Sequence, residues 1–488
     1  MQESMRVPFV LRGEIIDDCT VEHGGRHGQA RFLTPDIESA LGRLPLREPS
    51  RMADLYSLTM DDIVGYLARL GKALDVRTNR HMQEAFALSC RTSGLSEPIL
   101  RYYYELIPQS FEPAVVREMA ERLVGIDYLE GWVEQASALH TGVPTRVRAF
   151  GARCVHVIAG NVPMVSVGTV VRNAFTRSDA IIKTPSNDPL TATAIARTMV
   201  EMDRDHPLTR HMSVVYWKGG DESVEREIYD PRGVEKIVAW GGFASIKHVT
   251  RYLQPGLDLI TLDPKHSSTI IGREAFADDV TLESVARRLA LDIGAMNQEG
   301  CVNARVVYVQ SGTDAEGLAR ANRLGELAIA ALQQLPEFLS TPHKAFDAAL
   351  KEEIDGLRYA GDEYVVYGGR KNEGAIIVSQ NDAPVDFARQ LACRVGNIVP
   401  LDDIDTAVRS VNAYTQTIGI FPETLKTQLR DRLSYQGAQR LVSLGAAALF
   451  EDAATPQDGI EPVRRMCKWI VEQTSDPVML DNLARGTM

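Results

Sequence analysis

A regular alternation of short apolar runs and helix-type segments, beginning near residue 150, constrains the fold of this chain more than any other feature. Runs rich in β-branched residues alternate with segments of helical periodicity such as 190–202 and 243–253; the runs occupy 153–160, 180–184, 212–217, 235–240 and 258–262. Continuous apolar strands joined through helices favour a mostly parallel sheet that is covered on both faces. Sheets of this kind bind ligands beyond the carboxyl ends of their strands.

A second α/β series follows the first. Helical segments at 280–296 and 313–335 accompany apolar runs at 305–309, 363–367, 375–379 and 397–401. The sequence therefore predicts two α/β lobes with a cleft between them. Helical spacing also predicts helices at 60–74 and 112–138, and in two tail segments, 434–450 and 461–473.

Composition excludes several classes of protein. The 488 residues carry a net charge of −12 and no basic stripe, so nucleic acid is a poor partner. No run approaches the ~20 apolar residues of a membrane span, and the acidic N-terminus does not resemble a secretory signal. The six cysteines lie far apart and form no CxxC pair. These features predict a reduced, cytoplasmic protein without a metal site.

Two segments carry side chains suited to acyl chemistry. Cys301 follows Gly300 in a polar turn before an apolar strand, where a thiol can face a cleft and backbone N–H donors. Asn161 precedes Val162 and Pro163 directly after a strand, and a fixed amide donor can stabilise an oxyanion. Both have ordinary interpretations as well, since most lone cysteines are buried hydrophobes and Asn and Pro are common in turns.

Two further segments fit nucleotide binding. Lys183 lies at a strand end, where a ribose or phosphate would meet the sheet, although a solvated loop lysine is the ordinary alternative. Gly241 and Gly242 separate a strand from a helix, and such a turn lets backbone approach phosphate at a helix N-terminus. This pair is not the full GxGxxG pattern and also suits a simple turn.

Taken in order, these four segments resemble the aldehyde dehydrogenase superfamily. The spacings from Asn161 to Lys183, Gly241 and Cys301 are similar to those of that superfamily, as is the segment 147–163. A closer resemblance is to the long-chain fatty acyl-CoA reductases of bacterial luminescence, the LuxC type. It rests on the four segments together with YTQTIGIFPE (414–423), GAQRLVSLGA and PQDGIEPVRRMCKW (456–469).

The resemblance implies a two-lobed aldehyde-dehydrogenase-like fold, with a Rossmann-like parallel-sheet cofactor domain and an α/β catalytic domain. We expect a mainly helical N-terminal segment (1–110), a nucleotide-binding domain (111–263), a catalytic domain (264–425) and a helical C-terminal segment (426–488).

The resemblance also implies roles for individual residues. Cys301 would be the nucleophile, and Asn161 the oxyanion donor beside the Cys301 backbone N–H. Lys183 and Ser186 would meet the adenosine ribose, Gly241 and Gly242 the pyrophosphate, and Gln390 the nicotinamide ribose. Local dipoles should lower the pKa of a nucleophilic thiol.

Two departures from the superfamily narrow the expected reaction. Thr261 stands where hydrolytic relatives carry a glutamate base, so an acyl-cysteine should survive long enough to be reduced; Glu299 is an alternative base or a solvated loop carboxylate. Ser186 replaces the acid that often accepts from the ribose 2′-hydroxyl, which leaves room for a 2′-phosphate and favours NADPH over NADH.

The sequence thus predicts reduction of an acyl-CoA or other acyl thioester to an aldehyde, with CoA as the leaving group. Oxidative CoA acylation of an aldehyde, acyl-phosphate reduction and an inactive scaffold remain alternatives. A homo-oligomer and an acyl-transferring partner protein are also expected from the resemblance.

Overall fold

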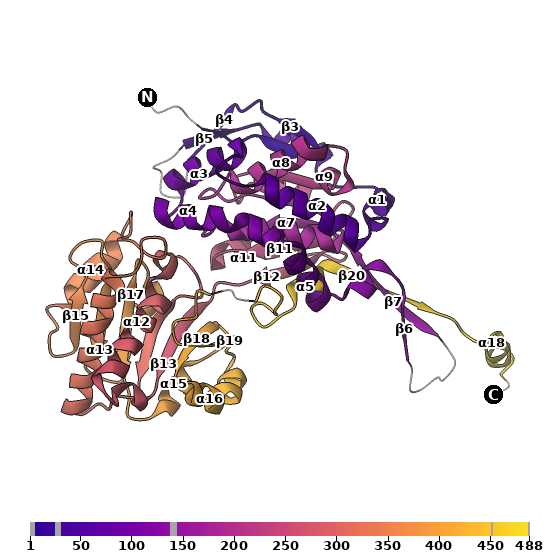
Figure 1. Ribbon diagram of the computed structural model, residues 1–488. Helices are drawn as coiled ribbons and strands as arrows, with labels where there is room; N and C mark the ends of the chain where they lie inside the picture. Colours follow the sequence, from indigo (N-terminus) through magenta and orange to yellow (C-terminus); the bar gives the residue numbers. More distant parts are fainter. Residues whose placement is uncertain (1–4, 25–30, 137–143, 450–451, 487–488) are drawn as a thin grey trace.

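The computed structural model describes residues 5–24, 31–136, 144–449 and 452–486, and it contains two large sheets, one in each lobe (Figure 1). The first sheet has the strand order β12-β11-β8-β9-β10-β2-β3. Its first five strands are mutually parallel, whereas β2 and β3 form an antiparallel edge. The strands are β12 (Asp258–Leu262), β11 (Lys236–Trp240), β8 (Arg153–Val157), β9 (Asp179–Lys183), β10 (Met212–Val215), β2 (Phe9–Leu11) and β3 (Glu14–Ile16). The predicted parallel sheet is confirmed.

Helices cover this first sheet. Between its strands lie α7 (Met164–Thr176), α8 (Thr191–Asp203), α9 (Pro207–Arg210), α10 (Glu222–Ile228) and α11 (Phe243–Val249). The preceding part of the chain packs α2 against α7 and α3 against α8. It supplies α1 (Ala53–Tyr56), α2 (Met60–Ala73), α3 (Arg80–Thr92), α4 (Glu97–Leu106), α5 (Pro113–Leu123) and α6 (Ile126–Glu130). The predicted helix at 60–74 is confirmed, and Thr59 and Asp62 form its capping box.

The second sheet has the order β15-β16-β17-β14-β13-β18-β19, in which only the β15–β16 pair is antiparallel. The strands are β15 (Tyr364–Gly368), β16 (Ala375–Ser379), β17 (Val395–Pro400), β14 (Ala304–Val309), β13 (His266–Ile271), β18 (Thr415–Phe421) and β19 (Arg440–Ser443). Alternate residues of β14 face opposite sides, as continuous apolar strands require: Val307 packs with α12 (Asp279–Gly294) and α13 (Ala315–Gln333), and Tyr308 with α15 (Ile404–Ser410) and α16 (Glu423–Gln436). A further helix, α14 (Ala348–Leu357), follows α13.

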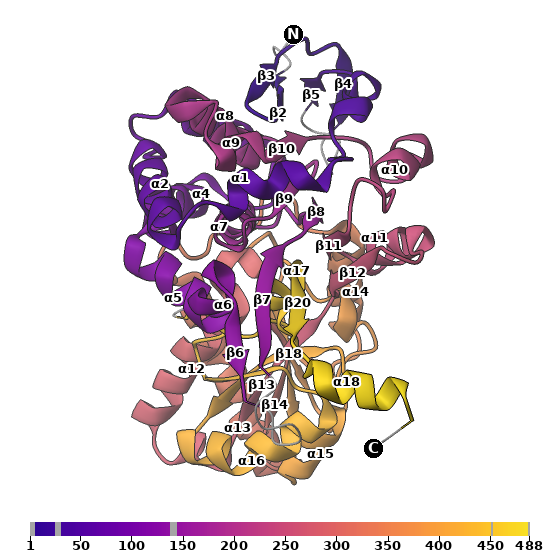
Figure 2. The same ribbon diagram turned by 90° about the vertical axis from the view of Figure 1, so that its right-hand side faces the viewer.

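The chain passes from the first sheet to the second between β12 and β13, with only residues 263–265 between them (Figure 1). A third, antiparallel sheet of order β20-β7-β6 extends from the first lobe as an arm. It consists of β20 (Cys467–Gln473), β7 (Thr145–Gly151) and β6 (Val133–Gln135), and α18 (Pro477–Ala484) lies beyond it (Figure 2).

The tail prediction is wrong in part. Residues 426–488 are not a helical segment, because β19 and β20 lie within it and only α16, α17 (Pro462–Met466) and α18 are helical. Gly437, at φ 116°, ends α16 before β19. β20 pairs with β7, more than 300 residues earlier, and a local period cannot reveal such a distant partner.

The N-terminal segment also differs from the prediction. Its first part forms strands, of which β2 and β3 join the first sheet; β1 (Met5–Arg6), β5 (Arg31–Thr34) and β4 (Val21–Gly24) form a small sheet of their own. The stretch 112–138 is broken at Gly125, at φ 100°, and contains β6; residues 137 and 138 lie outside the described part of the chain. Among the described residues, no helix is both long and apolar enough to cross a membrane.

Candidate active site

Most of the residues predicted to bind a nucleotide lie at one edge of the first sheet. Asn161 follows β8, Lys183 is the last residue of β9, and Gly241 and Gly242 follow β11. These three strands are neighbours and parallel, so their carboxyl ends meet at this edge. Ser186 lies in the loop that β9 enters.

The loops after β8 and β9 touch each other at Gly160. Asn187 donates from Nδ2 to the Gly160 carbonyl at 2.9 Å. A Cβ at Gly160 would lie 2.3 Å from Asn187 Oδ1 and 2.6 Å from the Pro185 ring, so only glycine allows this approach. The loop that carries Asn161 is therefore fixed against the loop that carries Ser186.

The Cys301 turn is held by buried amides. Met296, Asn297 and Gln298 all adopt positive φ, between 51° and 64°, which is uncommon for residues other than glycine. Gln298 donates to the carbonyls of Ala304 and Val395 and accepts from the Val395 N–H at 2.8 Å. These bonds tie the turn to β14 and β17 and offset the strain of the backbone.

The structure brings Asn161 and the Cys301 turn together across the two lobes. Asn161 donates from Nδ2 to the backbone carbonyl of Glu299 at 3.4 Å, two residues before Cys301. Its Oδ1 is buried and has no partner among the described residues. Cys301 is partly exposed rather than sealed in a core. The Asn161 amide therefore contacts the turn that carries the Cys301 thiol.

The pKa of the Cys301 thiol is raised, which contradicts the expectation of a lowered value. Burial is the largest cause, and the Asp458 carboxylate adds to it. A hydrogen bond from Gln416, the charge of Arg305 and the Cys301 backbone N–H act in the opposite direction. The dipoles predicted from the sequence are present, but loss of solvation outweighs them.

Glu299 is not simply a solvated loop carboxylate. Its Oε1 lies 3.0 Å from Nε2 of buried His343, and its side chain packs against Gly94 of the first lobe. Burial lowers the pKa of His343, but hydrogen bonds to Cys393 and Glu299 prevail and raise it to about 10. The contact with Glu299 therefore favours the imidazolium form of His343.

Lys183 is partly buried beside an aromatic wall. Its Nζ lies 5.7 Å and 5.5 Å from the ring centroids of Tyr216 and Trp217. Burial lowers its pKa to about 8, against the opposing charge of Glu225. An anion bound at Lys183 would raise this pKa again and further favour the charged ammonium form.

Glu225 is a buried carboxylate that sequence reasoning missed. It accepts from the Tyr252 hydroxyl at 3.0 Å and the Gly220 N–H at 3.2 Å, and His248 Nε2 lies 2.5 Å away. With its oxygens occupied by protein groups, Glu225 offsets the charge of Lys183 without offering a free acceptor to a ribose. No sequence pattern marks it, because α10 reads as an ordinary surface helix.

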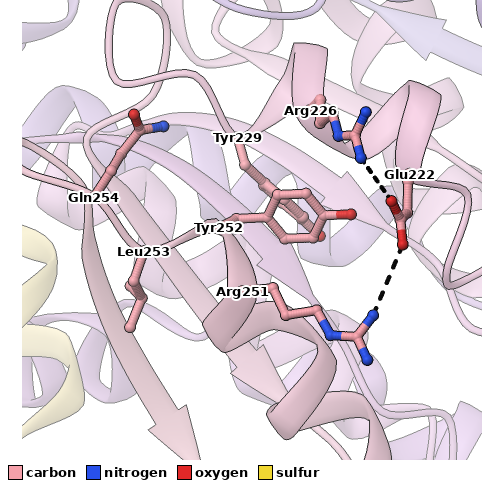
Figure 3. Close-up of a pocket in the computed structure, with 7 residues that line it drawn as sticks. All are labelled: Glu222, Arg226, Tyr229, Arg251, Tyr252, Leu253 and Gln254. Carbon is pink, nitrogen blue, oxygen red and sulfur yellow. Dashed lines mark hydrogen bonds and ion pairs between the residues drawn. The ribbon is translucent and has the colours of Figure 1, made fainter.

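A pocket of about 420 Å³ is lined in part by Tyr229, Arg251 and Tyr252 (Figure 3). The Tyr252 ring is tilted by 57° against the Tyr229 ring, with 5.0 Å between their centroids. Glu222 pairs with both arginines of the pocket, Arg226 and Arg251. Tyr252 thus links this pocket to the Lys183 end of the sheet through Glu225.

Two other predicted positions lie outside these contacts. Gln390 is exposed on a short 3₁₀ turn (Ala388–Gln390), and its neighbour Leu391 accepts from Arg305 at 2.9 Å. Its role at the nicotinamide ribose stays a prediction. Thr261 lies in β12, the strand that leads into the interlobe crossing.

The family model described as "Acyl-CoA reductase (LuxC)" matches residues 55–469. The chain belongs to the LuxC family of acyl-CoA reductases.

Two curated relatives of this LuxC-family chain are named long-chain acyl-protein thioester reductase. The one from Photorhabdus laumondii is 31% identical over 338 residues, which span 66% of this chain and 64% of that protein. The one from Aliivibrio fischeri is 30% identical over 353 residues, which span 71% of this chain and 68% of that protein.

Solved structures with the same fold are aldehyde dehydrogenases. Aldehyde dehydrogenase 21 of Physcomitrella patens aligns with a TM-score of 0.74 at 16% identity, covering 97% of this chain and 99% of that one. An NADP-dependent glyceraldehyde-3-phosphate dehydrogenase of Bacillus halodurans aligns with a TM-score of 0.73 at 13% identity. The alignment covers 97% of this chain and 100% of that one. The predicted aldehyde-dehydrogenase-like fold of this LuxC-family chain is therefore confirmed.

Proposed function

We propose that this chain reduces a long-chain acyl thioester to the aldehyde through an acyl-Cys301 intermediate, with NADPH as the preferred reductant. The observation that supports the proposal is the contact between Asn161 Nδ2 and the carbonyl of Glu299, two residues before Cys301. The names of the LuxC family model and of the two thioester reductases support the substrate class.

The Cys301 thiolate attacks the thioester carbonyl, and the CoA or carrier thiol leaves. Asn161 Nδ2 and the Cys301 backbone N–H donate to the tetrahedral oxyanion. A bound nicotinamide supplies the hydride for the second step. The resulting thiohemiacetal collapses to the aldehyde and returns the thiolate on Cys301.

The carboxyl edge of the first sheet suits a dinucleotide. Lys183 and Ser186 would hold the adenosine ribose with its phosphate, and the uncrowded backbone at Gly242 would face the pyrophosphate. NADPH is favoured because Ser186 brings no charge and Glu225 is already bonded to protein donors. Gln390 would meet the nicotinamide ribose.

A homo-oligomer and an acyl-transferring partner protein remain part of the proposal. The arm supports self-association, since Ile470 and Val471 of β20 are exposed, as are Val478 and Leu480 of α18. Rate measurements with acyl-CoAs and acyl-proteins of different chain lengths would identify the preferred acyl group and its carrier.

Initial rates test the direction of the reaction. We expect NADPH oxidation with release of free thiol from acyl-CoA or an acyl-protein, and slower turnover from aldehyde, CoA and NADP⁺. Faster oxidative turnover would overturn the proposed direction, and reduction of an acyl phosphate without thiol release would overturn the substrate class. Ser186→Glu should shift the preference toward NADH by about tenfold, because a carboxylate repels a 2′-phosphate.

A further inference from the structure

A buried amide on β18 lies beside the nucleophile and has no role in the reaction described so far. Gln416 is 6% exposed and belongs to the amino end of β18. Its Oε1 is buried and has no partner among the described residues. Burying an amide without full bonding is costly, so the position of this side chain requires an explanation.

Hydrogen bonds fix the amino end of β18 against the Cys301 turn. Ser267 Oγ donates to the Cys301 carbonyl at 2.7 Å and accepts from the Thr417 N–H at 3.1 Å. Cys301 and the residue after Gln416 therefore share one bridging hydroxyl. The position of the Gln416 backbone relative to the sulfur is set by the sheet.

The Gln416 side chain is held by a carboxylate. Its Nε2 donates to Asp458 Oδ1 at 2.5 Å. Asp458 adopts φ 54° in a turn closed by reciprocal backbone bonds between Gln457 and Ile460. Arg172 of α7 donates to Gln457 Oε1 at 3.3 Å, so groups from both lobes fix this turn.

An amide nitrogen carries two hydrogens, and Asp458 takes only one of them. We propose that Gln416 is a catalytic residue that donates the other hydrogen to the Cys301 sulfur, and that Asp458 is a positioning residue that aims this amide. This inference rests on the proposed function of Cys301. Burial raises the pKa of Cys301 and Asp458 adds to this, whereas the Gln416 amide acts in the opposite direction.

The donor acts whenever the sulfur carries negative charge. In the attack, it favours the thiolate over the thiol. In the last step, the carbon–sulfur bond of the thiohemiacetal breaks, its electron pair goes to sulfur and the oxyanion becomes the aldehyde carbonyl. The same N–H then stabilises the departing thiolate, and no further reactant is needed.

The charges around Asp458 predict opposite effects for two variants. Burial and the nearby Asp263 raise the pKa of Asp458, whereas Lys265 lowers it. Cys301 and Gln416 face the Asp458 carboxylate from the second lobe. Gln416→Met removes the donor to sulfur and should make the thiol harder to ionise. Asp458→Asn keeps an oxygen that accepts from Gln416 but removes a negative charge, so it should make the thiol easier to ionise.

The rate of alkylation of Cys301 by iodoacetamide between pH 6 and pH 10, followed by peptide mass spectrometry, measures this ionisation. At neutral pH we expect Gln416→Met to slow alkylation about tenfold and Asp458→Asn to accelerate it about threefold, as changes of this size correspond to a pKa change of one or less. Gln439→Met is the matched control, since Gln439 lies beside Gln416 and donates its backbone N–H to the Gln416 carbonyl at 3.2 Å.

Unchanged alkylation in Gln416→Met, relative to the control, would overturn the inference, whatever the result for Asp458→Asn. If Gln416→Met fails to fold, as judged by NADPH binding, the direction of the Asp458→Asn effect decides, and slower alkylation in that variant would also overturn it. The proposed function is tested separately by acylation of wild-type Cys301. A protein acylated at Cys301 but insensitive to both variants would retain that function and lose the role of Gln416.

Discussion

The two sheets present their site residues from opposite ends. In the first sheet, Asn161, Lys183 and Gly241 lie at the carboxyl ends of β8, β9 and β11. In the second sheet, Cys301 precedes β14, and Ser267 and Gln416 lie at the amino ends of β13 and β18. The carboxyl ends offer loops that lead into helices and suit phosphates. The amino ends instead offer a rigid platform on which a nucleophile can be fixed.

Asn161, from the first lobe, donates a hydrogen bond to the turn that precedes Cys301. Asn161→Ala should slow acylation of Cys301 about 10²–10³-fold, because an oxyanion donor contributes that much to catalysis. Rapid-quench mass spectrometry measures the single-turnover rate. Asn381→Ala, at an exposed turn of the second lobe, should have no effect. An unchanged rate in Asn161→Ala would show that the two sheets do not share one oxyanion site.

Substitution of Lys183 tests whether the first sheet alone holds the cofactor. Lys183→Met should weaken NADPH binding about 10- to 100-fold, the usual loss for a charged hydrogen bond. Fluorescence titration measures the affinity, and Lys218→Met, an exposed lysine just beyond β10, is the matched control. Acylation of Cys301 without NADPH should be unaffected, and a comparable loss of acylation would contradict the division of roles.

Substitution of Gly160 tests how closely the loops after β8 and β9 must pack. Gly160→Ala places a methyl against Asn187 and Pro185 and should reduce both NADPH affinity and acylation about fivefold to tenfold, with ~1–3 kcal/mol lost from the free energy of unfolding. Gly168→Ala is the control, because no neighbouring atom lies within 4 Å of its added Cβ and alanine favours α7. Equal behaviour of the two variants would contradict the loop contact.

The His343–Glu299 pair is expected to give the smallest effect. The pKa of His343 is about 10 in the folded protein, and its usual value is near 6.5. Protonated His343 therefore stabilises the folded state fully below pH ~6.5, and this stabilisation is lost as the pH rises through 10. His343→Gln should remove about 1 kcal/mol of this pH-dependent stability. Urea unfolding at pH 7 and pH 10 measures it, and an equal pH dependence in the variant would contradict the ion pair.

The sequence predicted the first sheet and its edge well because local patterns carry that information. Strands β8, β9, β10, β11 and β12 are apolar on both faces, and Asn161, Lys183 and Gly241 directly follow or end three of them. The parallel sheet predicted that a ligand binds at this edge, whereas the grouping and the roles of these residues came from the resemblance to a family.

The second sheet was less predictable because its site depends on contacts between distant residues. Gln416 and Asp458 meet across 42 positions, and Glu299 and His343 across 44, with no local signal for either pair. Cys301 was singled out by resemblance to a family, since its turn alone also suits a buried thiol. The strands of the tail were missed for the same reason, because their partners lie elsewhere in the chain.

Intact-protein mass spectrometry with a long-chain acyl-CoA tests the central claim most directly. We predict one acyl adduct, mapped by peptide analysis to Cys301, which is discharged as aldehyde when NADPH is added and is absent from Cys301→Ala, although that variant still binds NADPH. Aldehyde formation by Cys301→Ala, or an adduct on another residue, would contradict the account.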